Sequence, residues 1–285
     1  MNSLTVNIFI FILHIYLLVN VITEDNIELG QSSCRYSGNH DPNNTACYVN
    51  AFEISKLPTN ECTSYVYDGI SCTNDSKIVP NYSPDDLTNI KLLTNFSSKV
   101  FLFYGLNVND WFSNNFNDSI ETTAQNLKEF IDEYPIAGLI LTGIEYPVLT
   151  DNFYIEFQSY VTCIKNKNPK IKIGFYIKAL TMIVLTNATT WFDFSKLNDT
   201  IDFYLITFHG FNDCTDKLYD SGTTPLNSDD PNIYTLEKFG ASLTDSKIAR
   251  EKVYLEFVIT PTVNYKDRFK YRHCEVSFNQ VYKCF

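Results

Sequence analysis

Basic residues are scarce in this chain of 285 residues. It contains 22 Lys and Arg against 33 Asp and Glu, and its pI is about 4.8. Proteins that bind nucleic acids follow the phosphate backbone with a basic surface, and this charge balance leaves little material for one. We therefore do not expect a nucleic acid as partner.

Charged residues are missing from the first 22 positions. The apolar stretch over residues 8–22 is interrupted only by His14 and Asn20, and charge returns at Glu24 and Asp25. This stretch is shorter than the roughly 20 apolar residues that span a bilayer. It predicts a signal peptide over residues 1–23 and a secreted domain over residues 24–285, with no membrane association after cleavage.

Spacings typical of metal ligands are also missing. The chain has no pair of Cys-x-x-Cys units, and His40, His209 and His273 lie at no zinc-site spacing from one another. We expect neither a metal nor a cofactor. The eight cysteines are an even number, which in a secreted chain predicts four disulfides whose pairing the count leaves open.

Asn-x-Ser/Thr sequons are frequent and predict a glycoprotein. Seven occur, although Pro84 directly after the sequon at Asn81 usually lowers its use. They begin at Asn43, Asn74, Asn81, Asn95, Asn117, Asn187 and Asn198.

From residue 99 onward, short apolar runs alternate with segments of helical period. The predicted strands are 99–104, 137–142, 171–177, 201–207 and 253–259, with earlier candidates at 64–67 and near Cys34. One predicted helix is capped by Ser119 and stopped by Pro135, and the next begins at Asp151; weaker helical segments follow at 180–197 and 233–243. This alternation predicts one α/β domain, either a TIM (β/α)8-type barrel or a doubly wound sheet.

Several segments, in order along residues 34–284, resemble glycoside hydrolase family 18, the chitinases and chitinase-like lectins. Cys34-Arg-Tyr resembles the Cys-Tyr that ends the family's first strand, and 62–67 resembles its Cys-Thr-His-Ile-Ile-Tyr second strand. Residues 138–147 resemble the Asp-Gly-x-Asp-x-Asp-x-Glu-Tyr-Pro signature, and 206–209 stand where Met-x-Tyr-Asp is usual. The resemblance implies a TIM barrel and a disulfide between Cys34 and Cys62.

The family's reaction, as the resemblance implies it, uses a Glu that protonates the glycosidic oxygen. An Asp two residues earlier holds the acetamido group of the sugar while that group attacks the anomeric carbon. Counting back from Glu145 in steps of two predicts that Gly143, Leu141 and Leu139 face the barrel interior. The interval from Gly138 to Glu145 is one residue longer than in the family, so an insertion or bulge that changes which residues face inward stays open. Glu145 is then a remnant general acid without its Asp, and no position from 137 to 144 holds a carboxylate.

Other predicted site residues lie at the expected mouth of the barrel. Phe208 and His209 stand where the family has Tyr and Asp, and Tyr104, Trp111 and Tyr146 are candidate sugar-stacking aromatics. Only about 25 residues follow the seventh strand, so the predicted barrel is incomplete at its C-terminal end. Three ways to account for this stay open: a truncated chain, a gap plugged by the segment with Cys274 and Cys284, or a gap covered by another chain.

These observations lead to three hypotheses. The first is a secreted chitinase-like glycoprotein that has lost hydrolysis and binds chitin, N-acetylglucosamine oligosaccharides or a protein partner. The second is a weak or altered glycosidase in which Glu145 works with a carboxylate from another strand. The third is a structural or signalling glycoprotein without a sugar site.

Overall fold

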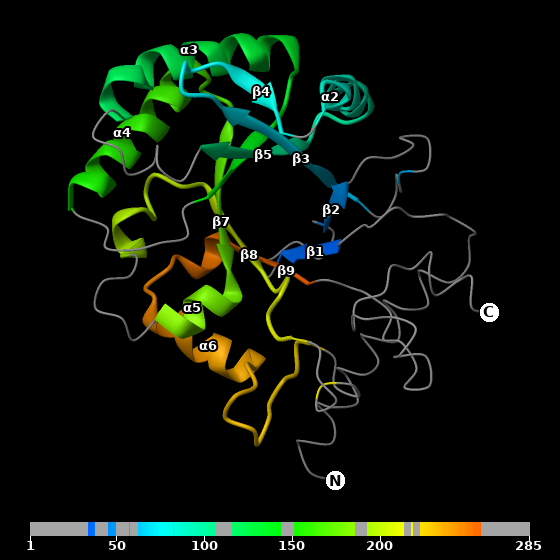
Figure 1. The fold of residues 1–285 in the computed structure, drawn as a ribbon, viewed down its shortest axis with the longest axis vertical. Helices are drawn as coiled ribbons and strands as arrows, with labels where there is room; N and C mark the ends of the chain where they lie inside the picture. Colours follow the sequence, from blue (N-terminus) through cyan, green and yellow to red (C-terminus); the bar gives the residue numbers. More distant parts are fainter. Residues whose placement is uncertain are drawn as a thin grey trace.

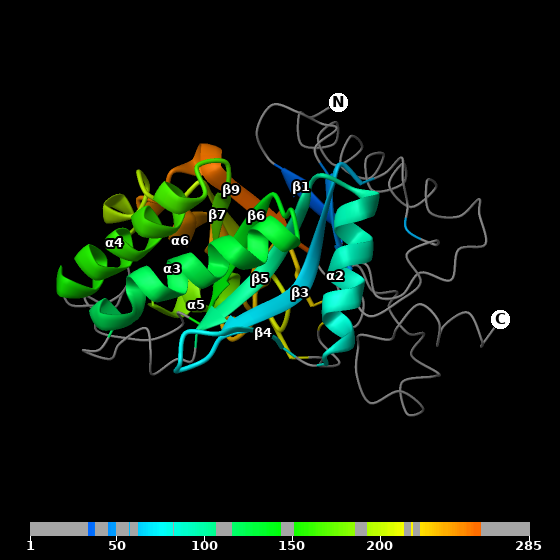
Figure 2. The same cartoon turned by 90° about the horizontal axis from the view of Figure 1, so that it is seen from above.

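The computed structural model shows one curled sheet with helices packed outside it (Figures 1 and 2). It describes residues 34–37, 45–49, 57, 62–81, 83–106, 116–143, 151–185, 193–213, 218 and 223–257. The strands are β1 (Cys34–Ser37), β2 (Thr45–Val49), β3 (Ser64–Cys72), β4 (Ile78–Pro80), β5 (Val100–Leu106), β6 (Gly138–Thr142), β7 (Lys172–Lys178), β8 (Phe203–Thr207) and β9 (Val253–Glu256). The α-helices are α2 (Asp85–Phe96), α3 (Phe116–Glu133), α4 (Asp151–Lys167), α5 (Ala179–Leu185) and α6 (Leu236–Asp245), and two short 3₁₀ helices span Phe194–Lys196 and Arg250–Lys252.

The strand pairings form a ring. They run β2–β1–β9–β8–β7–β6–β5–β3, and β3 pairs in turn with β2. The six pairings from β2–β3 through β8–β9 are all parallel, whereas the short β4 pairs antiparallel with β3 outside the ring. The predicted TIM-type architecture with an incomplete parallel series is therefore confirmed.

β1 takes the eighth place in the ring. It runs antiparallel to both neighbours, with Arg35 opposite Ala46 of β2 and opposite Glu256 of β9. A strand near Cys34 was expected from the sequence, but not this orientation. A strand from the N-terminal side thus lies between the first and the last parallel strand. The segment with Cys274 and Cys284 lies outside the described residues.

The helices bury the apolar stripes that their sequences predict. In α3 the residues Ile120, Ala124, Leu127 and Phe130 are buried, and in α4 the buried stripe is Phe153, Phe157, Tyr160, Val161 and Ile164. These residues pack with the outward-facing strand side chains in one large core. α3 lies beside α4, and α5 lies beside α6 (Figure 1). The parallel series is therefore covered by helices on its outer face, as in a (β/α) barrel.

One disulfide joins the first two parallel strands, and it corrects the predicted pairing. Cys62, just before β3, bonds to Cys47 of β2, with Cα atoms 5.7 Å apart. β2 lies between β1 and β3, so Cys34 is one strand further away from Cys62 than Cys47 is. Cys47-Tyr48 is therefore the Cys-Tyr that precedes the second strand, and the assignment to Cys34-Arg-Tyr was wrong. The bond closes a 15-residue separation, which corresponds to about 3 kcal/mol in the chain-entropy treatment.

Two further described cysteines form no disulfide. Cys72 is buried and Cys163 is partly exposed, and neither forms a disulfide. The prediction that all eight cysteines pair was therefore wrong. Burial, together with the nearby Glu121, raises the pKa of the Cys163 thiol. A raised pKa favours the protonated thiol of Cys163 over the nucleophilic thiolate.

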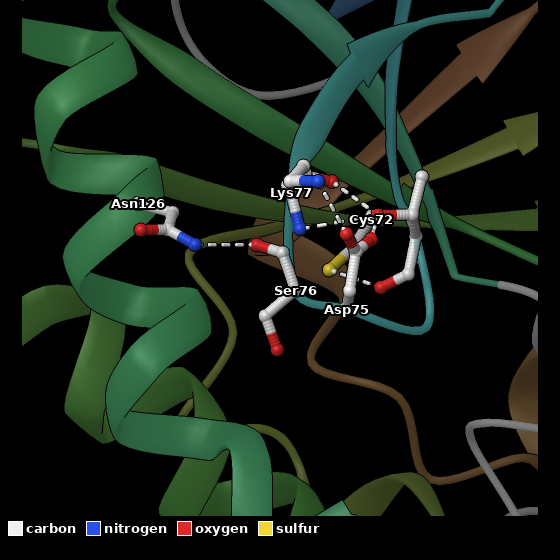
Figure 3. Close-up of polar contacts among 6 residues, drawn as sticks. Cys72, Asp75, Ser76, Lys77 and Asn126 are labelled. Atoms are coloured by element: carbon white, nitrogen blue, oxygen red, sulfur yellow. Dashed lines mark hydrogen bonds and ion pairs between the residues drawn. The ribbon is translucent and has the colours of Figure 1, made fainter.

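A tight turn after β3 leads into β4 and is tied to α3 (Figure 3). Ser76 N–H donates to the Thr73 carbonyl at 2.8 Å, and Lys77 forms an ion pair with Asp75 at 2.6 Å. Asn126 of α3 donates from Nδ2 to the Ser76 carbonyl at 2.7 Å. These bonds hold Ser76 at a φ of 63° and fix the turn at the carboxyl end of β3.

Candidate functional site

The interior of the ring is filled by a second, smaller apolar cluster. Val66, Phe103, Ile140 and Leu205 form its buried centre. Ala46, Tyr48, Phe101, Tyr176, Phe203 and Tyr254 pack around them. All seven parallel strands contribute, and in each strand these residues alternate with residues of the outer core. The smaller cluster therefore marks the side of each strand that faces the barrel interior.

Two glycines make room for phenylalanine rings inside this cluster. A Cβ at Gly138 would lie 2.5 Å from the Phe101 ring and 2.6 Å from the Lys172 carbonyl, and a Cβ at Gly174 would overlap the Phe203 ring. Phe101 and Phe203 meet edge to face with centroids 5.5 Å apart. Side chains therefore fill the interior around Gly138 and Gly174. A ligand site in a barrel of this type is expected at the carboxyl ends of the strands.

Polar side chains replace apolar ones at the carboxyl ends of the strands. Each lies two positions after an interior residue of the same strand, so it shares the interior face. Four of them are the last residues of their strands, and the fifth, Asp68, lies at the irregularity in the middle of β3. We call the group the mouth residues: Asp68, Thr142, Lys178, Thr207 and Glu256. Thr207 and Glu256 are buried, and the other three are partly exposed.

Three of the mouth residues form hydrogen bonds with a neighbouring strand or with the chain that follows their own strand. Tyr48 donates its phenol hydroxyl to Asp68 Oδ2 at 3.2 Å, and Thr142 donates to the Tyr104 carbonyl at 3.4 Å. Thr207 Oγ1 accepts from the backbone N–H of His209 at 3.1 Å. The mouth thus combines two carboxylates, one ammonium group and two hydroxyls on a rigid frame, which suits hydrogen bonding to a polyhydroxylated ligand.

The phase of β6 differs from the prediction. Leu139 and Leu141 lie in the outer core, whereas Ile140 belongs to the interior cluster. The expectation that Leu139, Leu141 and Gly143 face inward was therefore wrong; the interior positions are Gly138, Ile140 and Thr142. Gly143 has a φ of 84°, a left-handed conformation that ends the regular alternation of the strand. The three interior positions of β6 before the turn, Gly138, Ile140 and Thr142, hold no carboxylate.

Tyr104 lies on the outer side of the barrel. It is fully buried, and its hydroxyl lies 2.6 Å from the hydroxyl of Tyr160 in α4. Burial raises the pKa of both phenols well above the usual value. This placement does not fit the predicted role of Tyr104 as a sugar-stacking residue, because β5 presents Phe103 and Gly105 to the interior instead.

Phe208 and His209 follow β8 but point to different environments. Phe208 is 2% exposed and stacks on Phe257 with ring centroids 4.6 Å apart. It also meets Phe211 and Phe239 edge to face. His209 is exposed. Phe208 is therefore a packing residue, which corrects its predicted role in binding, and His209 alone of this pair is open to solvent.

Glu145, Trp111 and Tyr146 lie outside the described residues, so their predicted roles remain predictions. Sequence reasoning missed Asp68, Lys178 and Glu256. The signal that could have found them is the step from an apolar residue to a charged one two positions later, which occurs within or just after three of the predicted strands, 64–67, 171–177 and 253–259.

The seven predicted glycosylation sites differ in their surroundings. Asn74, Asn81 and Asn95 are exposed, and Asn198 is partly buried. Asn198 Oδ1 accepts from the Tyr204 hydroxyl and from the Ala249 N–H, both at 3.0 Å. Asn117 lies in α3, and Asn43 and Asn187 lie outside the described residues.

The described residues contain neither a cluster of metal ligands nor a membrane-spanning helix. Among the described residues, no group of three or more His, Cys, Asp or Glu side chains could hold a metal ion. No helix within the described part of the chain is long and apolar enough to cross a bilayer.

Solved chitinase structures share this arrangement of strands and helices. A chitinase from Rhizomucor miehei is 15% identical, with a TM-score of 0.51, over 74% of this chain and 67% of its own. The chain has the chitinase barrel fold. Catalytic domain 2 of the Ostrinia furnacalis Group II chitinase, in complex with a penta-N-acetylated chitooligosaccharide, is 13% identical with a TM-score of 0.55 over 73% of this chain and 62% of its own. Human YKL-39, described as a pseudo-chitinase with retained chitooligosaccharide binding, is 15% identical with a TM-score of 0.54 over 73% of this chain and 64% of its own.

These likenesses are structural. No family model matches the chain, and no curated protein matches it in sequence. At identities of 13–15% the comparison establishes the chitinase fold, and the residues at the mouth must carry any statement about chemistry.

Proposed function

We propose that this protein is a secreted, chitinase-like glycoprotein that binds chitin-type oligosaccharides of N-acetylglucosamine and does not hydrolyse them. The observation that carries this proposal is the interior face of β6, where Ile140 and Thr142 occupy the positions that precede the turn at Gly143. A chitinase-type reaction needs a carboxylate on this face to hold the acetamido group as positive charge develops on the sugar.

The size of the expected loss follows from the missing charge. Removing one preorganised stabilising group from an active site commonly costs about 10²–10³ in rate, or roughly 2.7–4 kcal/mol. Thr142 can offer a hydroxyl but not a charge, and its Oγ1 already donates to the Tyr104 carbonyl. Ile140 offers neither. Glu145, if it points into the mouth, would then lack the partner that makes its proton transfer productive.

Binding has better support than turnover. The mouth residues supply a cation, two anions and two hydroxyls beside an apolar interior, and small-molecule sites commonly combine an apolar lining with a few polar groups. YKL-39 is described as a pseudo-chitinase that keeps chitooligosaccharide binding, so the fold is compatible with binding without hydrolysis. Secretion follows from the charge-free segment over residues 1–23, and fusing this segment to a reporter tests it by export of the reporter.

Hydrolysis and binding can be measured separately. We expect no release of fluorophore from a fluorogenic chitobioside above the rate of buffer. We also expect that chitooligosaccharides change the tryptophan fluorescence, which reports on only two residues, Trp111 and Trp191. Glu256→Gln should weaken this binding severalfold, while Glu251→Gln, at an exposed position in the adjacent 3₁₀ helix, should leave it unchanged. A flat titration at millimolar sugar would refute sugar binding and favour a structural, signalling or protein-binding role.

A second candidate function is an altered glycosidase. The observation in its favour is that Asp68, in the middle of β3, and Glu256, at the carboxyl end of β9, place two carboxylates on the interior face. Either would be the partner from another strand that Glu145 needs. Measurable release of fluorophore that is abolished by Glu145→Gln, and also by Glu256→Gln or Asp68→Asn, would establish this function and overturn the proposal of inactivity.

A further inference from the structure

Helix α2 exposes two large apolar side chains next to each other. Leu92 is 49% exposed and Phe96 is 40% exposed, and they lie one turn apart on the helix. The opposite face of α2 is buried through Asp86, Ile90 and Leu93. α2 stands at the edge of the helical layer, beside β3 (Figure 2). Its outward face therefore carries an apolar pair that the described part of the chain leaves in solvent.

A glycosylation sequon lies within the same patch. Asn95, Phe96 and Ser97 form an Asn-x-Ser sequence at the end of α2. Asn95 is exposed, and it is three residues after Leu92 and directly before Phe96. Residues three and four apart are neighbours on a helical surface, so positions 92, 95 and 96 form one contiguous triangle.

We propose that Asn95 carries an N-linked glycan whose first sugars cover Leu92 and Phe96. The donor is an oligosaccharide linked to a lipid diphosphate, which the secretory pathway supplies. A bond forms between Asn95 Nδ2 and the anomeric carbon of the first sugar, the bond from that carbon to the diphosphate oxygen breaks, and the amide loses one proton. The attached glycan is bulky and hydrophilic, and it shields the apolar pair from other molecules.

The environment of Phe96 supports this assignment. Its ring packs edge to face on Tyr65 with centroids 5.5 Å apart, so the side chain is held in a fixed position rather than free to fold away. A fixed, half-exposed ring beside the amide offers a sugar a flat apolar surface on which to lie.

Two other sequons have different surroundings and serve as comparisons. Asn74 lies in the turn after β3, where its neighbours Asp75 and Lys77 are charged, so a glycan there covers no apolar surface. Asn198 donates from Nδ2 to the Lys247 carbonyl at 3.0 Å and so uses its amide within the fold. Asn95 alone of the three combines an exposed amide with an exposed apolar pair.

The first experiment maps the glycans on the full chain secreted from a eukaryotic host. Enzymatic release of the glycan converts the modified Asn to Asp, and peptide mass spectrometry should find this conversion at Asn95. Unmodified Asn95 would overturn the proposal, whether the protein carries glycans at other sequons or none at all.

The second experiment tests the covering role. Releasing the glycans from the folded protein should increase the fluorescence of a dye that binds exposed apolar surface, and should promote self-association. The Asn95→Gln variant should show the same increase without treatment, Asn74→Gln should not, and Leu92→Gln combined with Asn95→Gln should reverse most of it. An occupied Asn95 whose glycan can be removed without any rise in dye fluorescence would show that something else covers this face, and would refute the covering role.

Discussion

The buried pair of tyrosines between β5 and α4 allows a quantitative test of which way β5 faces. Tyr104 and Tyr160 are 0% and 2% exposed, and their hydroxyls lie 2.6 Å apart. Replacing either by Phe removes one hydroxyl and leaves the other buried without this partner, which costs about 1–3 kcal/mol. Replacing both removes the pair together, and the free energy of unfolding should recover toward that of the unmodified protein.

Thermal or urea unfolding followed by far-UV circular dichroism measures these changes. Each kcal/mol lost should lower the melting temperature by about 2–4 °C for a chain of this size. Tyr234→Phe, at a partly buried position outside the pair, is the control and should stay within about 0.5 kcal/mol of the unmodified protein.

Two results would contradict this reasoning. If the two single changes add up in the double variant, the hydroxyls are not partners. If Tyr104→Phe leaves the stability unchanged but weakens binding of chitooligosaccharides, then Tyr104 lies at the mouth as the sequence suggested, and the assignment of the interior face on β5 is wrong.

Three further predictions concern the interior, the loops and the pH dependence. Gly174→Ala should destabilise the protein by about 1–3 kcal/mol, because its Cβ would overlap Phe203, and adding Phe203→Leu should restore much of the loss in urea unfolding. Asn198→Ala should cost about 1 kcal/mol for each of its three hydrogen bonds, whereas Asn95→Gln should not change the unfolding free energy; equal effects of the two would refute the structural role of Asn198. Burial, reinforced by Asp86, raises the pKa of Tyr67 to about 12 from an unfolded value of about 10, so the folded state keeps a proton that the unfolded state loses. Stability should therefore be unaffected by this group below about pH 10 and should fall as the pH rises from 10 through 12, and a Tyr67→Phe variant that shows the same alkaline slope would contradict the assignment.

The parallel strands and two of the helices were predictable because their signals are local. β6 and β7 are continuous apolar runs, and α3 and α4 carry clear apolar stripes that the structure buries. α2 was not predicted. Its apolar residues Leu92 and Phe96 fall on the exposed face, opposite the buried Ile90, so the sequence shows no single stripe.

The errors at the candidate site have one physical origin each. Counting back from Glu145 assumed an unbroken strand, but Gly143 adopts a left-handed conformation and interrupts the two-residue period, so the phase was inverted. The disulfide was misplaced because Cys34 and Cys47 both stand near a tyrosine in short strands, and only the pairing of β2 with β3 distinguishes them. The sequence shows which strand positions carry the polar residues, but which of them become neighbours in space depends on the order of the strands in the ring, which local patterns do not reveal.

The antiparallel β1 also has a consequence for how the molecule assembles. Arg35 lies opposite Glu256 in the register of β1 and β9. The first described strand therefore pairs with the last one, and these contacts between distant parts of the chain close the ring. Such long-range contacts slow folding, because the entropy of closing a large loop is lost before the contacts form. While the chain is being synthesised, β1 can pair with β2, but its other backbone edge stays unpaired until β9 emerges, and an unpaired strand edge favours aggregation.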